Sequence, residues 1–184
     1  MPGAIRSRHF SKGVVFELAI SPAGEYFVVM AVISFLSTFI GRILPESWFD
    51  WQRFPYKSRP FEKDGKIYQH LSIQKWYKKL PDASRVFRRI FPDKSLKALS
   101  IDKLQILIKE TCVAEFVHSM LCVIGFCYGK LNEGPGVRLL TWMYILIGNL
   151  PFILIQRYNR PRLLRLLDRM QTKEMSVNFE TTVT

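Results

Sequence analysis

The hydrophobic and polar positions of this chain alternate between long uncharged runs and charged segments. Residues 139–156 form a run of 18 residues without a charge, placed between Arg138 and Arg157. As a helix that rises 1.5 Å per residue, this run covers roughly 27 Å of a hydrocarbon layer about 30 Å thick. A core helix of a soluble protein rarely needs such a run, so the pattern predicts a transmembrane span.

Two more runs have the same character. One predicted span covers residues 25–44, and another covers residues 111–128, where only Glu115 and His118 interrupt the apolar pattern. A chain of 184 residues has too little other sequence to bury three such helices in a soluble core. We therefore predict an all-α fold, an integral membrane helical bundle with about three transmembrane helices, in one membrane domain over residues 1–184.

The segment between the first two spans, residues 45–110, is basic and carries signals of the membrane interface. Helical spacing of apolar residues predicts amphipathic interfacial helices over residues 71–80 and 82–92. Ser100 can cap a helix that begins at Ile101 and runs into the second span. Aromatic residues crowd the start of the segment, as expected at a lipid headgroup layer: Trp48, Phe49, Trp51, Phe54 and Tyr56.

The net charge is +12, from 27 basic and 15 acidic residues, and the basic residues flank the predicted membrane spans. We therefore expect membrane lipids as partners and no nucleic acid. The short turn at residues 130–136 is poor in basic residues, whereas the tail at residues 157–184 is rich in them. Because basic loops stay inside, the tail and residues 45–110 are predicted to be cytoplasmic in a multi-pass protein of the cell membrane.

The most informative polar residues are Glu115 and His118, which lie inside the second predicted span. An ionisable residue there costs roughly 3 kcal/mol on insertion scales, so the pair must face protein, water or substrate. One reading is a general base, His118, oriented by a carboxylate. A second is a hydrogen-bonded pair that joins helices. A di-iron site would need a second Glu-x-x-His motif, which the sequence lacks, so no metal is predicted.

The third span adds a polar residue and a cationic end. Asn149 is an amide within the apolar run and needs a partner, while Pro151 can kink the helix. Arg157, Arg160 and Arg162 follow within six residues. Paired guanidinium donors of this kind suit phosphate or carboxylate groups, and a plain cytoplasmic anchor is the alternative.

These motifs resemble the glycosyl-4,4′-diaponeurosporenoate acyltransferase family. The similarity covers residues 75–167, from Lys75-Trp76 through the string E-T-x-x-A-E-x-x-H that ends at His118. It continues with Asn149-x-Pro151 and the string QRYNRPRL that begins at Gln156. The resemblance implies transfer of a fatty acyl chain to the primary hydroxyl of a sugar on a carotenoid acid, the last step to a staphyloxanthin-like pigment.

The roles of individual residues are inferred from the chemistry of such a transfer. His118 is the predicted base, with Glu115 as its orienting partner and Asn149 as a donor to the developing oxyanion. The predicted substrate-binding residues are Arg157, Arg160 and Arg162, for the donor's phosphates, with Lys75, Trp76 and Gln156. The expected substrates are acyl-CoA or an acyl carrier and a glycolipid or carotenoid glycoside, without a cofactor. The alternative is a non-catalytic membrane subunit whose polar stripe docks a partner helix.

Overall fold

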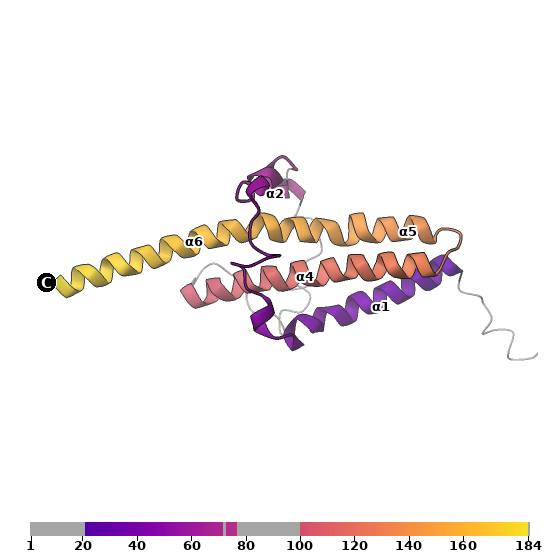
Figure 1. Ribbon diagram of the computed structural model, residues 1–184, viewed down its shortest axis with the longest axis horizontal. Coiled ribbons are helices and arrows are strands. Elements are labelled where there is room, and N and C mark those ends of the chain that lie inside the picture. Colours follow the sequence, from indigo (N-terminus) through magenta and orange to yellow (C-terminus); the bar gives the residue numbers. More distant parts are fainter. Residues whose placement is uncertain (1–20, 72, 77–99, 184) are drawn as a thin grey trace, which may run out of the picture.

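The computed structural model describes residues 21–71, 73–76 and 100–183, and helices dominate this part of the chain (Figure 1). Within it there is no β-strand, in agreement with the predicted all-α class. The long helices are α1 (Pro22–Ile43) and α4 (Ile101–Leu131), followed by a third that consists of α5 (Val137–Met143), the π-helix η6 (Tyr144–Asn149) and α6 (Leu150–Val183).

Helix α1 begins and ends where local sequence signals require it. The Ser21 hydroxyl accepts a hydrogen bond from the Gly24 N–H at 3.2 Å, and Pro22 occupies the first helical position, where its missing N–H costs nothing. The helix ends before Pro45, because the residue preceding a proline disfavours helical backbone angles.

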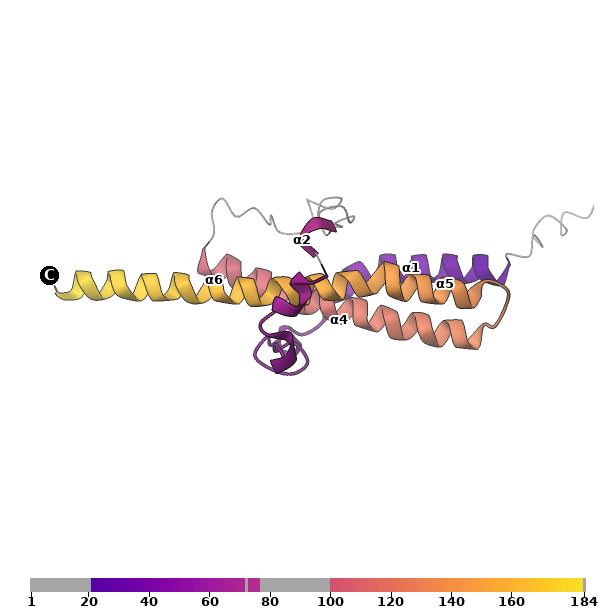
Figure 2. The same cartoon turned by 90° about the horizontal axis from the view of Figure 1, so that it is seen from above.

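Helix α4 confirms the prediction of one continuous helix from Ile101 into the second span. Ser100 caps it by accepting the Lys103 N–H at 3.2 Å. A tight turn at residues 132–136 then reverses the chain, and Gly136 permits it by adopting a φ of +81°. Helices α4 and α6 therefore lie side by side and antiparallel (Figure 2).

The third span accommodates Pro151 without a break. The preceding turn widens into the π-helix η6, which relieves the clash between a proline ring and the carbonyl four residues earlier. The Asn149 side chain donates to the Tyr144 carbonyl at 2.9 Å and so holds the widened turn. From Leu150 the helix continues through Pro161 to Val183, so the basic tail at residues 157–183 extends the third span as one helix.

Within the described part of the chain, three helices are long and apolar enough to cross a membrane, as predicted. They expose large apolar side chains along much of their length, which would be unfavourable in water and is expected against lipid tails. Examples are Phe27, Leu36, Val123, Leu139 and Ile147. Helix α4 begins ten residues before the predicted span at 111–128, so its first turns and most of α6 extend beyond the apolar part of the bundle.

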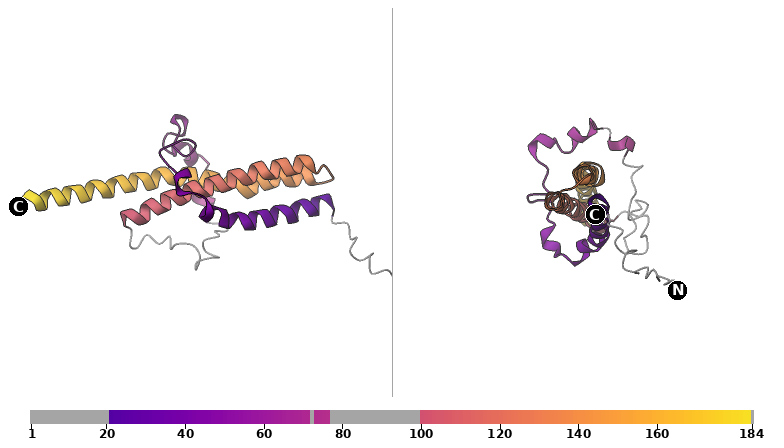
Figure 3. Two further views of the ribbon diagram at one scale, coloured as in Figure 1. Left: turned by 60° about the horizontal axis from the view of Figure 1, so that its bottom comes forward. Right: turned by 90° about the vertical axis from the view of Figure 1, so that its right-hand side faces the viewer.

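Residues 45–71 and 73–76 form a belt across the outside of the bundle, as the right-hand view of Figure 3, along the bundle axis, shows. The belt contains three short 3₁₀ helices, η1 (Glu46–Trp48), η2 (Pro60–Glu62) and η3 (Lys66–Gln69), and one helical turn, α2 (Ile73–Trp76). Phe49 and Tyr56 are buried and pack around Cys112 of α4. Of the predicted helix at 71–80, Ile73–Trp76 is helical and Leu71 lies in a turn. The other residues of that helix, and the whole predicted helix at 82–92, lie outside the described residues.

The predicted orientation can be tested with single cysteines in a background without Cys112, Cys122 and Cys127. Glu133→Cys is the reporter for the turn, because it is exposed whereas neighbouring Gly134 packs on Pro22. Lys173→Cys reports on the exposed end of α6. We expect a membrane-impermeant maleimide to label Glu133→Cys in intact cells and Lys173→Cys only after permeabilisation. The opposite labelling pattern would place the basic segments outside.

Candidate active site

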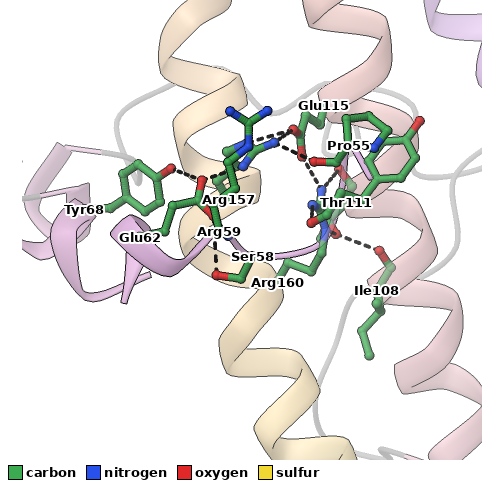
Figure 4. A network of polar contacts seen from close by, with 11 residues as sticks. Pro55, Ser58, Arg59, Glu62, Tyr68, Ile108, Thr111, Glu115, Arg157 and Arg160 are labelled. Atoms are coloured by element: carbon green, nitrogen blue, oxygen red, sulfur yellow. Dashed lines mark hydrogen bonds and ion pairs between the residues drawn. The ribbon is translucent and has the colours of Figure 1, made fainter. Parts of the chain in front are cut away.

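A buried network of ion pairs joins the belt to α4 and α6 (Figure 4). Its four charged members are Glu62 of the belt, Glu115 of α4, and Arg157 and Arg160 of α6. At 1.5 Å per residue, Glu115 lies roughly 25 Å from the end of α4 at Leu131. The network therefore sits near the edge of a hydrocarbon layer about 30 Å thick, on the side away from the 132–136 turn.

Arg160 is 3% exposed and turns its guanidinium into the protein. Its Nη2 donates to Glu115 Oε2 at 2.6 Å and to the Thr111 carbonyl at 3.0 Å. Its Nε donates to the Thr111 hydroxyl at 2.8 Å, and its Nη1 donates to the Tyr56 carbonyl at 2.7 Å. This side chain joins α6, α4 and the belt at one point.

Arg157 bridges the two carboxylates. Its Nε donates to Glu115 Oε1 at 2.8 Å, its Nη1 pairs with Glu62 Oε1, and its Nη2 donates to the Pro55 carbonyl at 2.8 Å. Burial opposes ionisation of Glu62, but hydrogen bonds from Tyr68, the Arg59 N–H and Arg157 outweigh burial and hold the pKa of that carboxyl below its usual value. Glu62 is therefore a carboxylate at neutral pH.

Sequence reasoning missed Glu62. Nothing near Arg59-Pro60 marks it, because Glu62 is one of several acidic residues in a charged segment. A count of charges could have indicated a second carboxylate: two arginines buried near a membrane edge need two anions, and Glu115 supplies one. The four charges sum to zero, which is the condition for burying them together.

His118 lies about one turn further along α4 towards the 132–136 turn and has a different partner. Its Nδ1 is 2.9 Å from Asn149 Oδ1, and its ring stacks on Phe152 with centroids 4.7 Å apart. The Tyr144 carbonyl can only accept, so the Asn149 amide nitrogen must face it and the amide oxygen must face His118. His118 then carries its proton on Nδ1, which leaves the Nε2 lone pair available.

The structure divides the residues that the sequence placed on one stripe between two clusters. Glu115 faces Arg157 and Arg160, and His118 faces Asn149, so the contacts do not join Glu115 to His118. The physical reason is that a carboxylate gains more from two guanidinium groups than from a neutral imidazole. Asn149 therefore meets the imidazole that sequence reasoning paired with Glu115.

The remaining predicted site residues are placed as follows. Arg162 is exposed on α6 and lies over the Tyr158 ring, with its Cζ 4.0 Å from the ring centroid. Gln156 is partly buried on α6, and Lys75 is exposed on α2. Trp76 ends α2, and its side chain lies outside the described part. Arg162 thus differs from Arg157 and Arg160, which both bind carboxylates.

A cavity of about 410 Å³ adjoins the ion network. Its polar wall contains Glu115 and Ser119 of α4, Arg157 of α6 and Glu62 of the belt. Its apolar wall is mainly aromatic and includes Tyr56, Phe61 and Phe116. Polar groups that converge within an apolar hollow are typical of a site for a small polar group attached to an apolar one.

Comparison with known proteins decides the family. The family model for glycosyl-4,4′-diaponeurosporenoate acyltransferase matches residues 45–169. That match covers more than half of the chain and includes residues 45–74, which the sequence motifs alone had not linked to the family. The chain belongs to this acyltransferase family.

Three curated relatives support the assignment, and all carry the name glycosyl-4,4′-diaponeurosporenoate acyltransferase. The proteins from Staphylococcus aureus strains MRSA252 and bovine RF122 / ET3-1 are 37% and 36% identical over 132 residues, which is 70% of this chain and 77% of each relative. The protein from strain Newman is 35% identical over 138 residues, which is 73% of this chain and 81% of the relative. No solved structure matches.

The ion network predicts a specific stability difference. Glu115→Gln removes one carboxylate and leaves two buried guanidinium groups with one, so we expect a loss of about 3–5 kcal/mol. Glu46→Gln is the matched control, because it breaks the exposed pair with Lys109 and should change stability little. Thermal unfolding in detergent measures both. Equal melting temperatures for Glu115→Gln and the wild type would contradict a structural role of the network.

Proposed function

We propose that this chain transfers a fatty acyl group from a thioester donor to a sugar hydroxyl of a carotenoid glycoside or related glycolipid, with His118 as general base. The relatives' name supports the reaction class and the acceptor. The observation that carries the mechanism is the contact between His118 and Asn149, which leaves Nε2 free to accept a proton. An acceptor anchored by its apolar part would hold its sugar at the depth of these residues.

The reaction needs one base and one thioester. His118 Nε2 takes the proton of the sugar hydroxyl while its oxygen attacks the acyl carbonyl carbon. The new C–O bond forms, the C–S bond breaks, and the departing thiolate takes the proton from the imidazolium. His118 returns to its starting state, so each cycle consumes one thioester and one hydroxyl and yields an ester and a thiol.

Asn149 serves as the orienting partner of His118 in this mechanism. Its amide oxygen accepts the Nδ1 proton and its amide nitrogen is held by the Tyr144 carbonyl. An amide fixed at both ends sets the tautomer and the plane of the ring, and Phe152 supports that plane by stacking. The Asn149 contacts favour this role over donation to the oxyanion, and the Glu115 contacts favour a structural role for that carboxylate.

The donor's phosphates require cations that are not already neutralised. Arg157 and Arg160 are engaged by carboxylates and backbone carbonyls, whereas Arg162 is exposed. Exposed Arg165 and Arg169 follow on α6 at helical spacing, so the three arginines share one side of the helix. We assign donor binding to this stripe, on the face that the charge bias predicts to be cytoplasmic.

If His118 is the general base, its removal causes a large loss of turnover. His118→Ala should lower acyl transfer by roughly 10²-fold or more, because the hydroxyl loses its proton acceptor. His70→Ala is the matched control, since His70 is exposed on the belt and lies outside the site. Mass spectrometry of the acylated glycolipid, formed by each protein in liposomes at equal protein content, measures the effect. Full transfer by His118→Ala would remove this mechanism while leaving the family assignment intact.

The assignment of donor binding to Arg162, Arg165 and Arg169 predicts an effect on the KM for the donor and little effect on kcat. Arg162→Gln should raise the KM for acyl-CoA several-fold at nearly constant kcat, because it removes a charge-assisted contact to phosphate. The control is Arg138→Gln, which removes an exposed arginine beside the distant turn. Initial rates over a range of donor concentrations separate the two constants. An unchanged donor KM in Arg162→Gln would place the phosphates elsewhere.

A further inference from the structure

The cavity beside the ion network has a charge balance that selects its ligand. Of the charged groups on its wall, Glu62, Glu115 and Arg157 belong to the network, whose fourth member, Arg160, lies directly behind Glu115. These four charges cancel, and Arg59 adds one cation at the rim. A multiply charged phosphate would find little net attraction here, whereas a neutral polar group would avoid the cost of an unpaired buried charge.

The wall also retains hydrogen-bonding capacity. Arg157 presents its guanidinium on this wall, where its N–H groups already contact Glu115, Glu62 and the Pro55 carbonyl, so a sugar hydroxyl would share these donors. Glu115 Oε2 accepts from Arg160 and has a second lone pair. The Ser119 hydroxyl is exposed on the same wall and can donate or accept. Such a mixture of fixed donors and acceptors matches adjacent hydroxyl groups of a sugar.

The aromatic wall supplies the second requirement for a sugar. Tyr56, Phe61 and Phe116 line the cavity together with the polar groups. The apolar C–H face of a hexose ring can pack on such side chains while its hydroxyls turn to the polar wall. A volume of about 410 Å³ lies within the range of small-molecule sites and has room for one hexose.

We propose that this cavity binds the sugar headgroup of the acceptor, and that Arg157, Glu115 and Ser119 hydrogen-bond to its hydroxyls. The proposal rests on the proposed function for the identity of the acceptor, but it assigns a site that sequence reasoning gave to the donor. Ser119, on the cavity wall, follows His118 directly on α4, whereas His118 does not line the cavity and packs on Asn149 and Phe152. The donor's thioester would then approach from the side of His118.

The test measures sugar binding without any acyl donor. The full-length protein in lipid nanodiscs is titrated with hexyl β-D-glucoside. Ligand-observed NMR reports binding as saturation transfer from the protein to the sugar protons. Titration with 1,6-hexanediol is the control for binding through the alkyl chain alone. Ser119→Phe places a bulky side chain in the cavity, and Ser119 takes no part in the ion network. Met120→Phe is the matched control, because Met120 is the next residue of α4, is 43% exposed and does not line the cavity.

We expect the wild type and Met120→Phe to bind the glucoside alike and Ser119→Phe to bind it at least tenfold more weakly. Equal glucoside affinity in Ser119→Phe, or no saturation transfer to the sugar protons of the wild type, would overturn the assignment. Loss of coenzyme A binding in Ser119→Phe with glucoside binding retained would overturn it in favour of the donor. Since no acyl transfer is measured, failure here is distinct from failure of the His118 mechanism.

Discussion

The requirement that buried charges be compensated at the membrane edge organises this protein. Arg157 and Arg160 lie where α6 leaves the apolar part of the bundle, and a guanidinium there is costly unless anions meet it. Glu115 comes from the neighbouring helix and Glu62 from the belt, so compensation requires both elements in place. The polypeptide between the first two spans is thereby held against the helix pair, together with the cavity that it helps to form.

The same constraint separates the structural polar groups from those available for chemistry. The carboxylates and the two inner arginines have their partners within the protein, whereas His118 is held by a neutral amide and keeps one ring nitrogen for a proton. The π-helical turn before Pro151 contributes to this arrangement, because Asn149 closes that turn with its amide nitrogen and thereby presents its oxygen to His118. A widened turn is a frequent feature of functional sites in helices.

The candidate site could be predicted in part. A carboxylate and an imidazole within an apolar run are visible in any sequence, since their insertion cost makes them stand out. Their partners are less visible. The three-residue spacing of Glu115 and His118 predicts one pair, yet Glu115 contacts Arg157 and Arg160 whereas His118 contacts Asn149. Glu62 gives no comparable signal, because its segment has no hydrophobic period.

Sequence alone determined the class of the molecule, because long uncharged runs, caps such as Ser100 and the glycine at the 132–136 turn act locally and leave few alternatives for the helices. It also carried the family motifs from Lys75 to the QRYNRPRL string. Tertiary structure decided which charges pair, which ring nitrogen of His118 stays free and where a cavity opens. These depend on contacts between residues some 30 to 100 positions apart, as between Glu62 and Arg157, which no local periodicity encodes.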